Sequence, residues 1–328
     1  VRLERIGLRR GYNSAIYRVI LEDGTTFAIK ITDHEEDAVL NMLHNRELEF
    51  YEWLDGVRRE KHCDHQALSH LLKYSGGTRC DDEPGVLIFN DLSNHVGTQP
   101  NYSIGYDPYV VFQIVKQIAG YQSVYLSTDK EVSMGKELIK YHCTAKRSLA
   151  KLKKLSWISD EEKQCLREWT LPQNLFDLHT KIPEGIEGIS GVLAHCDLWN
   201  GNLLFEEKEG TTHLLAILDW QTFKIGNPLL DVATIIGKNM ATEDRREYTD
   251  AILNLYLHQI GKQKTKFKKK FEITREKVEI LLSHALKWSC IQTMYAITLN
   301  PIDDIKEEGA EMGRLSIRLR ELLNDVNG

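Results

Sequence analysis

The stretch HCDLWNGNLLF at residues 195–205 limits the fold of this chain more than any other part of the sequence. It places a histidine, an aspartate and two asparagines within eight positions, and an apolar segment follows at once. Two explanations fit polar side chains directly before a buried strand. The stretch is either a polar turn that precedes a hairpin or a catalytic loop that the hairpin holds in place.

The residues after this motif predict an antiparallel β-hairpin. Residues 202–205 read as a short strand, the polar residues 206–212 as the connection, and residues 213–220 as the return strand. Such pairing places Asn202, where the first strand begins, across from Asp219, where the second ends. A carboxylate and an amide carbonyl at one end of a rigid hairpin suit Mg²⁺, which prefers hard oxygen ligands and accepts few from the protein.

Asp197 stands five residues before Asn202, on the loop that enters the hairpin. We expect its carboxylate to project into the same space as the two oxygen ligands. A base that accepts the proton of a substrate hydroxyl belongs at such a place, beside metal-bound phosphates. For His195, at the start of the motif, we expect a role in orienting the backbone and the second metal-binding carboxylate rather than in proton exchange.

The N-terminal residues predict a β-hairpin that carries a lysine. The apolar segments 14–21 and 25–32 are separated by Glu-Asp-Gly, a hairpin turn signal. Lys30 ends the motif FAIK in the second strand, where its ammonium can reach the α- and β-phosphates of a nucleotide. The GYNSA loop at 11–15 offers Gly11 and Ser14, whose backbone N–H groups can cap phosphates.

A helix expected over about 35–55 supplies the partner of this lysine. The apolar residues of this helix recur at intervals of three and four positions and so share one face. Glu47 is the one acidic residue on that face. Glu49 lies two residues further on and points to the opposite side. We therefore expect Glu47 to hold Lys30.

The rest of the chain predicts a mainly helical second part. A short buried strand is expected at 85–93, and a connection rich in Gly, Pro and Asn at 94–108. The residues from 191 to 219 form one β island among helical stretches. Those stretches fall at about 110–126, 136–155, 162–180, 245–260 and 274–298.

Charge and cysteine content exclude several classes of protein. The 42 Lys and Arg against 48 Asp and Glu give a net charge of −6, so there is no global basic field for nucleic acid or an anionic membrane. The six cysteines form no CxxC pair and have no zinc-ligand spacing, which is typical of reduced thiols in the cytoplasm. No apolar run reaches the length of a membrane span, and residues 1–10 lack the apolar core of a signal peptide.

Three further features each have a packing explanation and a functional one. The basic run 262–271 is expected to be a solvated surface, with a phosphate- or lipid-binding patch as the alternative. Cys196 is expected to be a small packing residue, with a redox-sensitive thiol as the alternative. Four aromatic residues could line a substrate pocket, even a box around a quaternary amine, although core packing is commoner. They are Trp199, Trp220, Trp288 and Tyr295.

This set of motifs resembles the protein-kinase-like fold, in its small-molecule branch of aminoglycoside phosphotransferases, choline kinases and ecdysteroid-kinase-like proteins. The resemblance rests on HCDLWNGN (195–202), which matches H-x-D-x-x-x-x-N, on ILDWQ (217–221) and GNPLLDVATII (226–236), and on FAIK upstream. The tryptophan after Asp-Leu is most similar to the ecdysteroid-kinase-like group, also called CHK-kinase-like. The order of the motifs covers most of the chain, from Gly11 to Asp231.

The resemblance implies an α+β, bilobal fold and an ATP- and Mg²⁺-dependent kinase. The small β-rich lobe would span residues 1–92, with a hinge at about 86–92, and the larger helical lobe with the catalytic hairpin would span 93–328. Hinge residues would bind adenine through their backbone; they are Phe89, Asn90, Asp91 and Leu92. By the same resemblance Asp197 is the base, Asn202 and Asp219 bind Mg²⁺, Lys30 pairs with Glu47, and Asp231 structures the catalytic loop.

The sequence departs from the protein-kinase pattern at several points, and these departures favour a small-molecule kinase. There is no G-x-G-x-x-G, the metal-binding aspartate is followed by Trp-Gln, and A-P-E is absent, which disfavours a protein kinase. The leading hypothesis is phosphoryl transfer to the hydroxyl of a small molecule of the amino alcohol, steroid or glycoside type. The alternative is a nucleotide-binding pseudokinase or scaffold without turnover.

Overall fold

The computed structural model describes residues 1–6, 14–33, 38–101, 104–132, 139–152, 157–299 and 305–327. Its contacts divide the chain into two compact units. Unit 1 comprises Val1–Gln99, Thr128–Gly135 and Gly201–Phe223, and unit 2 comprises Pro100–Ser127, Lys136–Asn200 and Lys224–Gly328. Over the described part of the chain, no helix has the length and apolarity that a membrane crossing requires.

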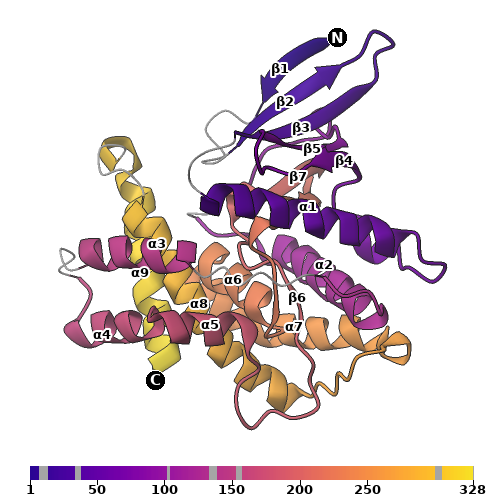
Figure 1. Cartoon of the computed structure of the whole chain (residues 1–328). Coiled ribbons are helices and arrows are strands. Elements are labelled where there is room, and N and C mark those ends of the chain that lie inside the picture. The colour runs from indigo at the N-terminus through magenta and orange to yellow at the C-terminus, as the bar shows by residue number, and fades with distance from the viewer. Residues whose placement is uncertain are drawn as a thin grey trace. The chain divides into compact units, whose positions relative to one another are not determined.

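Unit 1 contains a five-stranded antiparallel sheet in the order β1-β2-β3-β5-β4 (Figure 1). The β2–β3 hairpin turns at Gly24, whose φ of 83° is a conformation that glycine adopts without strain. Two of the five strands, β1 and β4, were not expected from the sequence. The strands are β1 (Arg2–Ile6), β2 (Ala15–Ile20), β3 (Thr26–Thr32), β4 (Tyr74–Thr78) and β5 (Gly85–Asn90).

Helix α1 (Ala38–Arg58) covers one face of this sheet, as Figure 1 shows. Its residues Phe50, Tyr51 and Leu54 are fully buried and form the core beneath the strands. The end of the helix is tied to the segment before β4, because the Arg58 guanidinium donates to the carbonyl oxygens of residues 68, 71 and 72. The helix therefore holds its polar residues in a fixed position against the sheet.

The hairpin of β7 (Leu203–Lys208) and β8 (Thr211–Ile217) belongs to unit 1 by its contacts, although it follows a strand of unit 2 along the chain. The Ile217 N–H donates to the carbonyl oxygen of His70, and the Gly97 N–H to that of Phe205, both at 2.8 Å. The turn is tighter than the expected connection at 206–212. It uses Glu209 and Gly210, which both have positive φ.

Unit 2 is mainly helical around the fully buried helix α6 (Leu230–Asn239), which packs against α8 (Arg275–Leu299). The helical stretch expected at 162–180 consists of two helices, because Pro172 begins a new one. Helices α6 and α9 were not expected. The other elements are α2 (Pro108–Ser127), α3 (Ile139–Leu152), α4 (Asp160–Trp169), α5 (Pro172–Thr180), α7 (Thr242–Gly261), α9 (Ile305–Asn327), β6 (Val192–Ala194) and β9 (Lys224–Gly226).

Candidate active site

Unit 1 brings together Lys30 from β3, Glu47 from α1 and Asp219 from the segment after β8. The Lys30 ammonium lies 2.6 Å from Glu47 Oε2 and 2.7 Å from Asp219 Oδ1. The three side chains are 14%, 2% and 26% exposed, respectively. A cation is thus held between two carboxylates at a largely buried position.

Burial and charge oppose one another in this triad. Burial lowers the pKa of Lys30, but Asp219 and Glu47 outweigh it and raise that pKa above its ordinary value. Burial raises the pKa of Glu47, and the Lys30 charge counteracts that effect. The lysine is therefore charged at neutral pH.

The hairpin also positions the two expected metal-binding residues. The Leu218 N–H donates to the Asn202 carbonyl oxygen at 2.9 Å, so Asp219 lies one residue beyond the position opposite Asn202. Asp219 is left-handed, with φ and ψ of 63°, and its Oδ2 accepts from Gln221 Nε2 at 3.0 Å.

These two oxygen donors fit Mg²⁺, an ion that is often held by only one or two carboxylates of the protein. Among the residues that the structure describes, no group of three or more His, Cys, Asp or Glu side chains is arranged to bind a metal. An ion that takes several ligands from water and substrate does not require such a group.

The loop that carries the expected base belongs to unit 2, where it follows β6. The Asp231 carboxylate accepts from the N–H groups of His195 at 2.7 Å and Cys196 at 2.9 Å, and from the Tyr121 hydroxyl. Gln292 Nε2 donates to the Cys196 carbonyl oxygen at 2.8 Å. The start of the loop is thus held by α6 and α8, and α2 donates to the carboxylate of α6.

The loop becomes more exposed at Asp197, directly after a residue with positive φ. Cys196 is left-handed, with a φ of 65°, and fully buried, while Asp197 is half-buried. The Asp197 N–H donates to His195 Nδ1 at 3.2 Å, so the neutral ring carries its proton on Nε2. His195 therefore contacts the backbone of the expected base.

Sequence spacing did not reveal Tyr121 and Gln292. They lie 110 residues before Asp231 and 96 residues after Cys196, respectively, and neither forms part of a motif. Their polarity within apolar helices is the one signal that could have found them.

The expected hinge residues have structural contacts of their own. Phe89 packs against Tyr51, with ring centroids 4.7 Å apart, and Asn90 Oδ1 accepts from the Lys73 N–H at 2.8 Å. Asp91 accepts from Arg18 Nε at 2.7 Å and from Ser93; burial raises its pKa, but these bonds outweigh burial and lower it. Leu92 is half-buried.

In the loop before β2, the Ser14 hydroxyl hydrogen-bonds the Thr32 hydroxyl at 2.8 Å. Gly11 lies outside the described residues. The role of this loop as a phosphate cap stays a prediction.

The four aromatic residues considered for a substrate pocket do not form one group. Trp220 is in unit 1, where it stacks on Phe50 at 4.1 Å between centroids, and both rings are fully buried. In unit 2, Trp288 is buried against His179 and lies 6.4 Å from the ring of Tyr295. Trp199 is half-buried, and the Lys238 ammonium lies 5.6 Å from its ring centroid.

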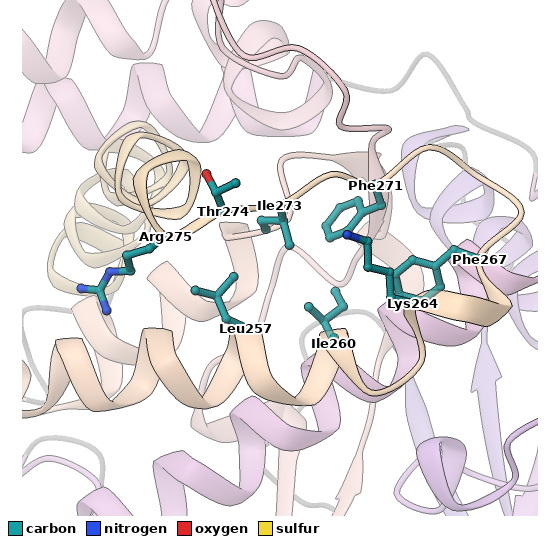
Figure 2. Close-up of a pocket in the computed structure, with 9 residues that line it drawn as sticks. Leu257, Ile260, Lys264, Phe267, Phe271, Ile273, Thr274 and Arg275 are labelled. Atoms are coloured by element: carbon teal, nitrogen blue, oxygen red, sulfur yellow. The ribbon is translucent and has the colours of Figure 1, made fainter.

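The basic run 262–271 borders a separate cavity in unit 2, drawn in Figure 2. The cavity has a volume of about 250 Å³. None of the expected site residues lines it. Its lining consists of Leu257, Ile260, Gly261, Lys264, Phe267, Phe271, Ile273, Thr274 and Arg275.

Solved structures share this fold across nearly the whole chain. A putative aminoglycoside phosphotransferase from Ralstonia eutropha JMP134 matches with a TM-score of 0.55 and 14% identity, covering 98% of this chain and 92% of that one. Choline kinase from Cryptosporidium parvum Iowa II matches at 0.54 and 14%, covering 98% and 88%. The GDP complex of wild-type aminoglycoside 2'-phosphotransferase-IIIa matches at 0.54 and 11%, covering 98% and 93%.

These matches confirm the protein-kinase-like fold that the sequence predicted. At sequence level, the chain is 25% identical over 297 residues to "Uncharacterized oxidoreductase dhs-27" from Caenorhabditis elegans, which covers 81% of this chain. The chain spans about a third (33%) of the length of that relative. The model of family DUF1679, described as "Uncharacterized oxidoreductase dhs-27", matches residues 22–279. The chain therefore belongs to this CHK/ecdysteroid-kinase-like family.

Proposed function

We propose that the chain is an ATP- and Mg²⁺-dependent phosphotransferase that acts on the hydroxyl of a small molecule. The observation that carries this proposal is the Lys30 ammonium held 2.6 Å from Glu47 and 2.7 Å from Asp219. A lysine fixed in this way on a central strand, beside a carboxylate that can bind metal, suits the phosphates of a nucleotide. The fold that the chain shares with small-molecule kinases supports the same reading.

Lys30 would bind the α- and β-phosphate oxygens, and Glu47 would keep its side chain extended towards them. The backbone of residues 89–92 would hydrogen-bond the adenine, and backbone N–H groups near Gly11 and Ser14 would cap phosphates. Asn202 and Asp219 would hold Mg²⁺, which when bound neutralises the charge of the phosphates.

Asp197 would act as the general base. The acceptor oxygen forms a bond to the γ-phosphorus while the bond from that phosphorus to the β–γ bridging oxygen breaks, and ADP leaves. The hydroxyl proton passes to the Asp197 carboxylate. Asp231 and Gln292 would support this step by fixing the loop through the backbone of His195 and Cys196.

A cytoplasmic location is part of the same proposal. None of Cys63, Cys80, Cys165, Cys196 and Cys290 forms a disulfide, as expected of a reducing compartment. The acceptor would be a small alcohol of the amino alcohol, steroid or glycoside type.

The word oxidoreductase in the name of the relative concerns a protein about three times as long as the matched region. Nicotinamide cofactors commonly bind at the edge of a parallel sheet that has helices on both faces. Every pair of strands in the described part of this chain is antiparallel. The matched region therefore gives no support to hydride transfer.

The test is ATP consumption across a panel of hydroxylated small molecules, with nucleotide binding measured in parallel. We expect Asp197→Ala to lose turnover by about a hundredfold or more while ATP binding survives, and Lys30→Met to lose both. Asp82→Ala, at an exposed position, is the matched control and should behave as the wild type. Near-normal turnover of Asp197→Ala would refute the base assignment, and ATP binding without any turnover would favour the pseudokinase.

A further inference from the structure

Lys238 occupies an unusual position in the last turn of α6. Its side chain is only 6% exposed, whereas lysines normally extend their ammonium into water. The Arg318 guanidinium donates to its carbonyl oxygen and fixes the backbone there. The proposed chemistry assigns no role to this buried cation.

The Lys238 ammonium faces the loop that carries the proposed base. It lies 5.6 Å from the centroid of the Trp199 ring, two residues after Asp197. Burial lowers the pKa of Lys238, and the charge of Asp197 opposes this effect. Among the residues that the structure describes, none accepts a hydrogen bond from this ammonium or pairs with it at salt-bridge distance.

Neighbouring residues hold α6 and the catalytic loop in a fixed relation. Asn239 Nδ2 donates to the Leu198 carbonyl oxygen at 3.0 Å, and the Tyr106 N–H donates to the Asn239 carbonyl oxygen at 2.6 Å. The Tyr106 hydroxyl donates to Asn200 Oδ1 at 2.8 Å. Lys238 is thus preorganised beside the loop rather than free to swing into solvent.

A buried cation without a close anionic partner is costly, and a ligand that brings an anion to it offsets this cost. A cationic ligand would instead be repelled. The Lys238 ammonium also covers the face of Trp199 that a quaternary amine would need. The local charge therefore favours an acceptor with a negative group.

We infer that Lys238 is a specificity-determining residue that binds an anionic group, such as a carboxylate, on the same small molecule whose hydroxyl Asp197 deprotonates. This inference rests on the proposed phosphotransferase function. It narrows the acceptor class to hydroxylated anions and excludes choline-like cations. The Lys238 ammonium donates charge-assisted hydrogen bonds to the anion, and Trp199 forms the apolar wall beside it.

The experiment compares hydroxy acids with the corresponding hydroxy amides and with choline. The pairs are glycerate with glyceramide and 4-hydroxymethylbenzoate with its amide, which differ in charge and little in shape. Equilibrium binding is measured by calorimetry without nucleotide, and phosphate transfer is measured with ATP and Mg²⁺. The variants of the full chain are Lys238→Gln, Lys238→Arg and the matched control Lys287→Gln, since the Lys287 ammonium lies 5.8 Å from the Trp169 ring.

We expect the wild type to prefer at least one acid over its amide by about tenfold or more, as the loss of a charge-assisted hydrogen bond implies. Lys238→Gln should abolish this preference, Lys238→Arg should keep most of it, and Lys287→Gln should leave it unchanged. An acid preference in binding without any phosphate transfer would support the anion site and refute the phosphotransferase.

Phosphate transfer to amides or choline as readily as to acids would overturn the role of Lys238 and leave the phosphotransferase intact. Equal binding of acids by the wild type and Lys238→Gln would also overturn the role of Lys238 as an anion-binding residue. Absence of binding and of transfer throughout the panel counts against both proposals.

Discussion

At the residue scale, the triad of Lys30, Glu47 and Asp219 balances one ammonium against two carboxylates. Lys30→Met keeps the aliphatic stem and removes the charge, which leaves Glu47 buried without its cation. We expect a loss of about 3 kcal/mol in the free energy of unfolding, as for other broken buried pairs. Urea unfolding measures it, with Lys73→Met at an exposed site as the control. Equal unfolding free energies of the two variants would show that the charge of Lys30 does not stabilise the fold.

The backbone of Cys196 is left-handed, a conformation that is strained for a residue with a side chain. Cys196→Gly should stay within about 1 kcal/mol of the wild type in unfolding free energy, since relief of strain offsets lost packing. Cys196→Val should cost about 2 kcal/mol or more, because β-branched residues fit this conformation poorly. The control is Cys290→Val, at a buried position inside α8. If valine were tolerated equally at both positions, the conformation of the loop would be in doubt.

At the element scale, α6 supports the start of the loop after β6 through the Asp231 carboxylate. Asp231→Ala leaves the N–H groups of His195 and Cys196 buried without an acceptor, and we expect it to cost about 3 kcal/mol in unfolding free energy. Tyr121→Phe removes one donor to the same carboxylate and should cost about 1 kcal/mol. Denaturant unfolding gives both values, and hydrogen exchange should show loss of protection at the two N–H groups in Asp231→Ala alone. Retained protection there would refute this role of Asp231.

The packing of α5 against α8 predicts a dependence of stability on pH. His179 is buried against Trp288, its Nδ1–H donates to the Leu175 carbonyl oxygen at 2.7 Å, and burial lowers its pKa from 6.5 to about 4. The unfolded chain therefore takes up a proton first as the pH falls. The stability contribution is fully present above pH 6.5 and is lost as the pH falls towards 4, by roughly 3 kcal/mol.

Chemical denaturation at several pH values tests this account. His179→Phe should flatten the stability curve between pH 6.5 and 4 relative to the wild type. The exposed control His62→Gln should keep the wild-type slope. An unchanged slope in His179→Phe would show that other groups dominate this pH range.

The sequence predicted some elements better than others, for physical reasons. The strands 14–21 and 25–32 and the catalytic hairpin are local, so alternation and turn residues reveal them. Strand β4 contains two glycines in YSGGT and is stabilised by pairing with β5, which no local pattern shows. The observed pairing places Leu218, and not Asp219, opposite Asn202, and the hairpin has a register shift between Leu204 and Phe205 that no local pattern shows.

At the scale of the whole molecule, the residues with proposed catalytic, binding and supporting roles are divided between the two units. Lys30, Glu47, Asn202 and Asp219 belong to unit 1, and Asp197 and Asp231 to unit 2. The motifs could be found because each is short and their order along the chain resembles a known family. Tyr121, Gln292 and Lys238 could not, since each lies on a helix distant in sequence from the residue it contacts, which is Asp231, Cys196 and Trp199, respectively.

The most direct measurement is the fate of the terminal phosphate of γ-labelled ATP. The full chain is incubated with Mg²⁺, labelled ATP and a mixture of hydroxylated small molecules, and the label is followed in the small-molecule, water-derived phosphate and protein fractions. We predict that the wild type transfers the label to a small molecule and that Asp197→Asn, which still binds ATP, does not. Label that remains on ATP in the wild type, or that passes to protein, would contradict the proposed function.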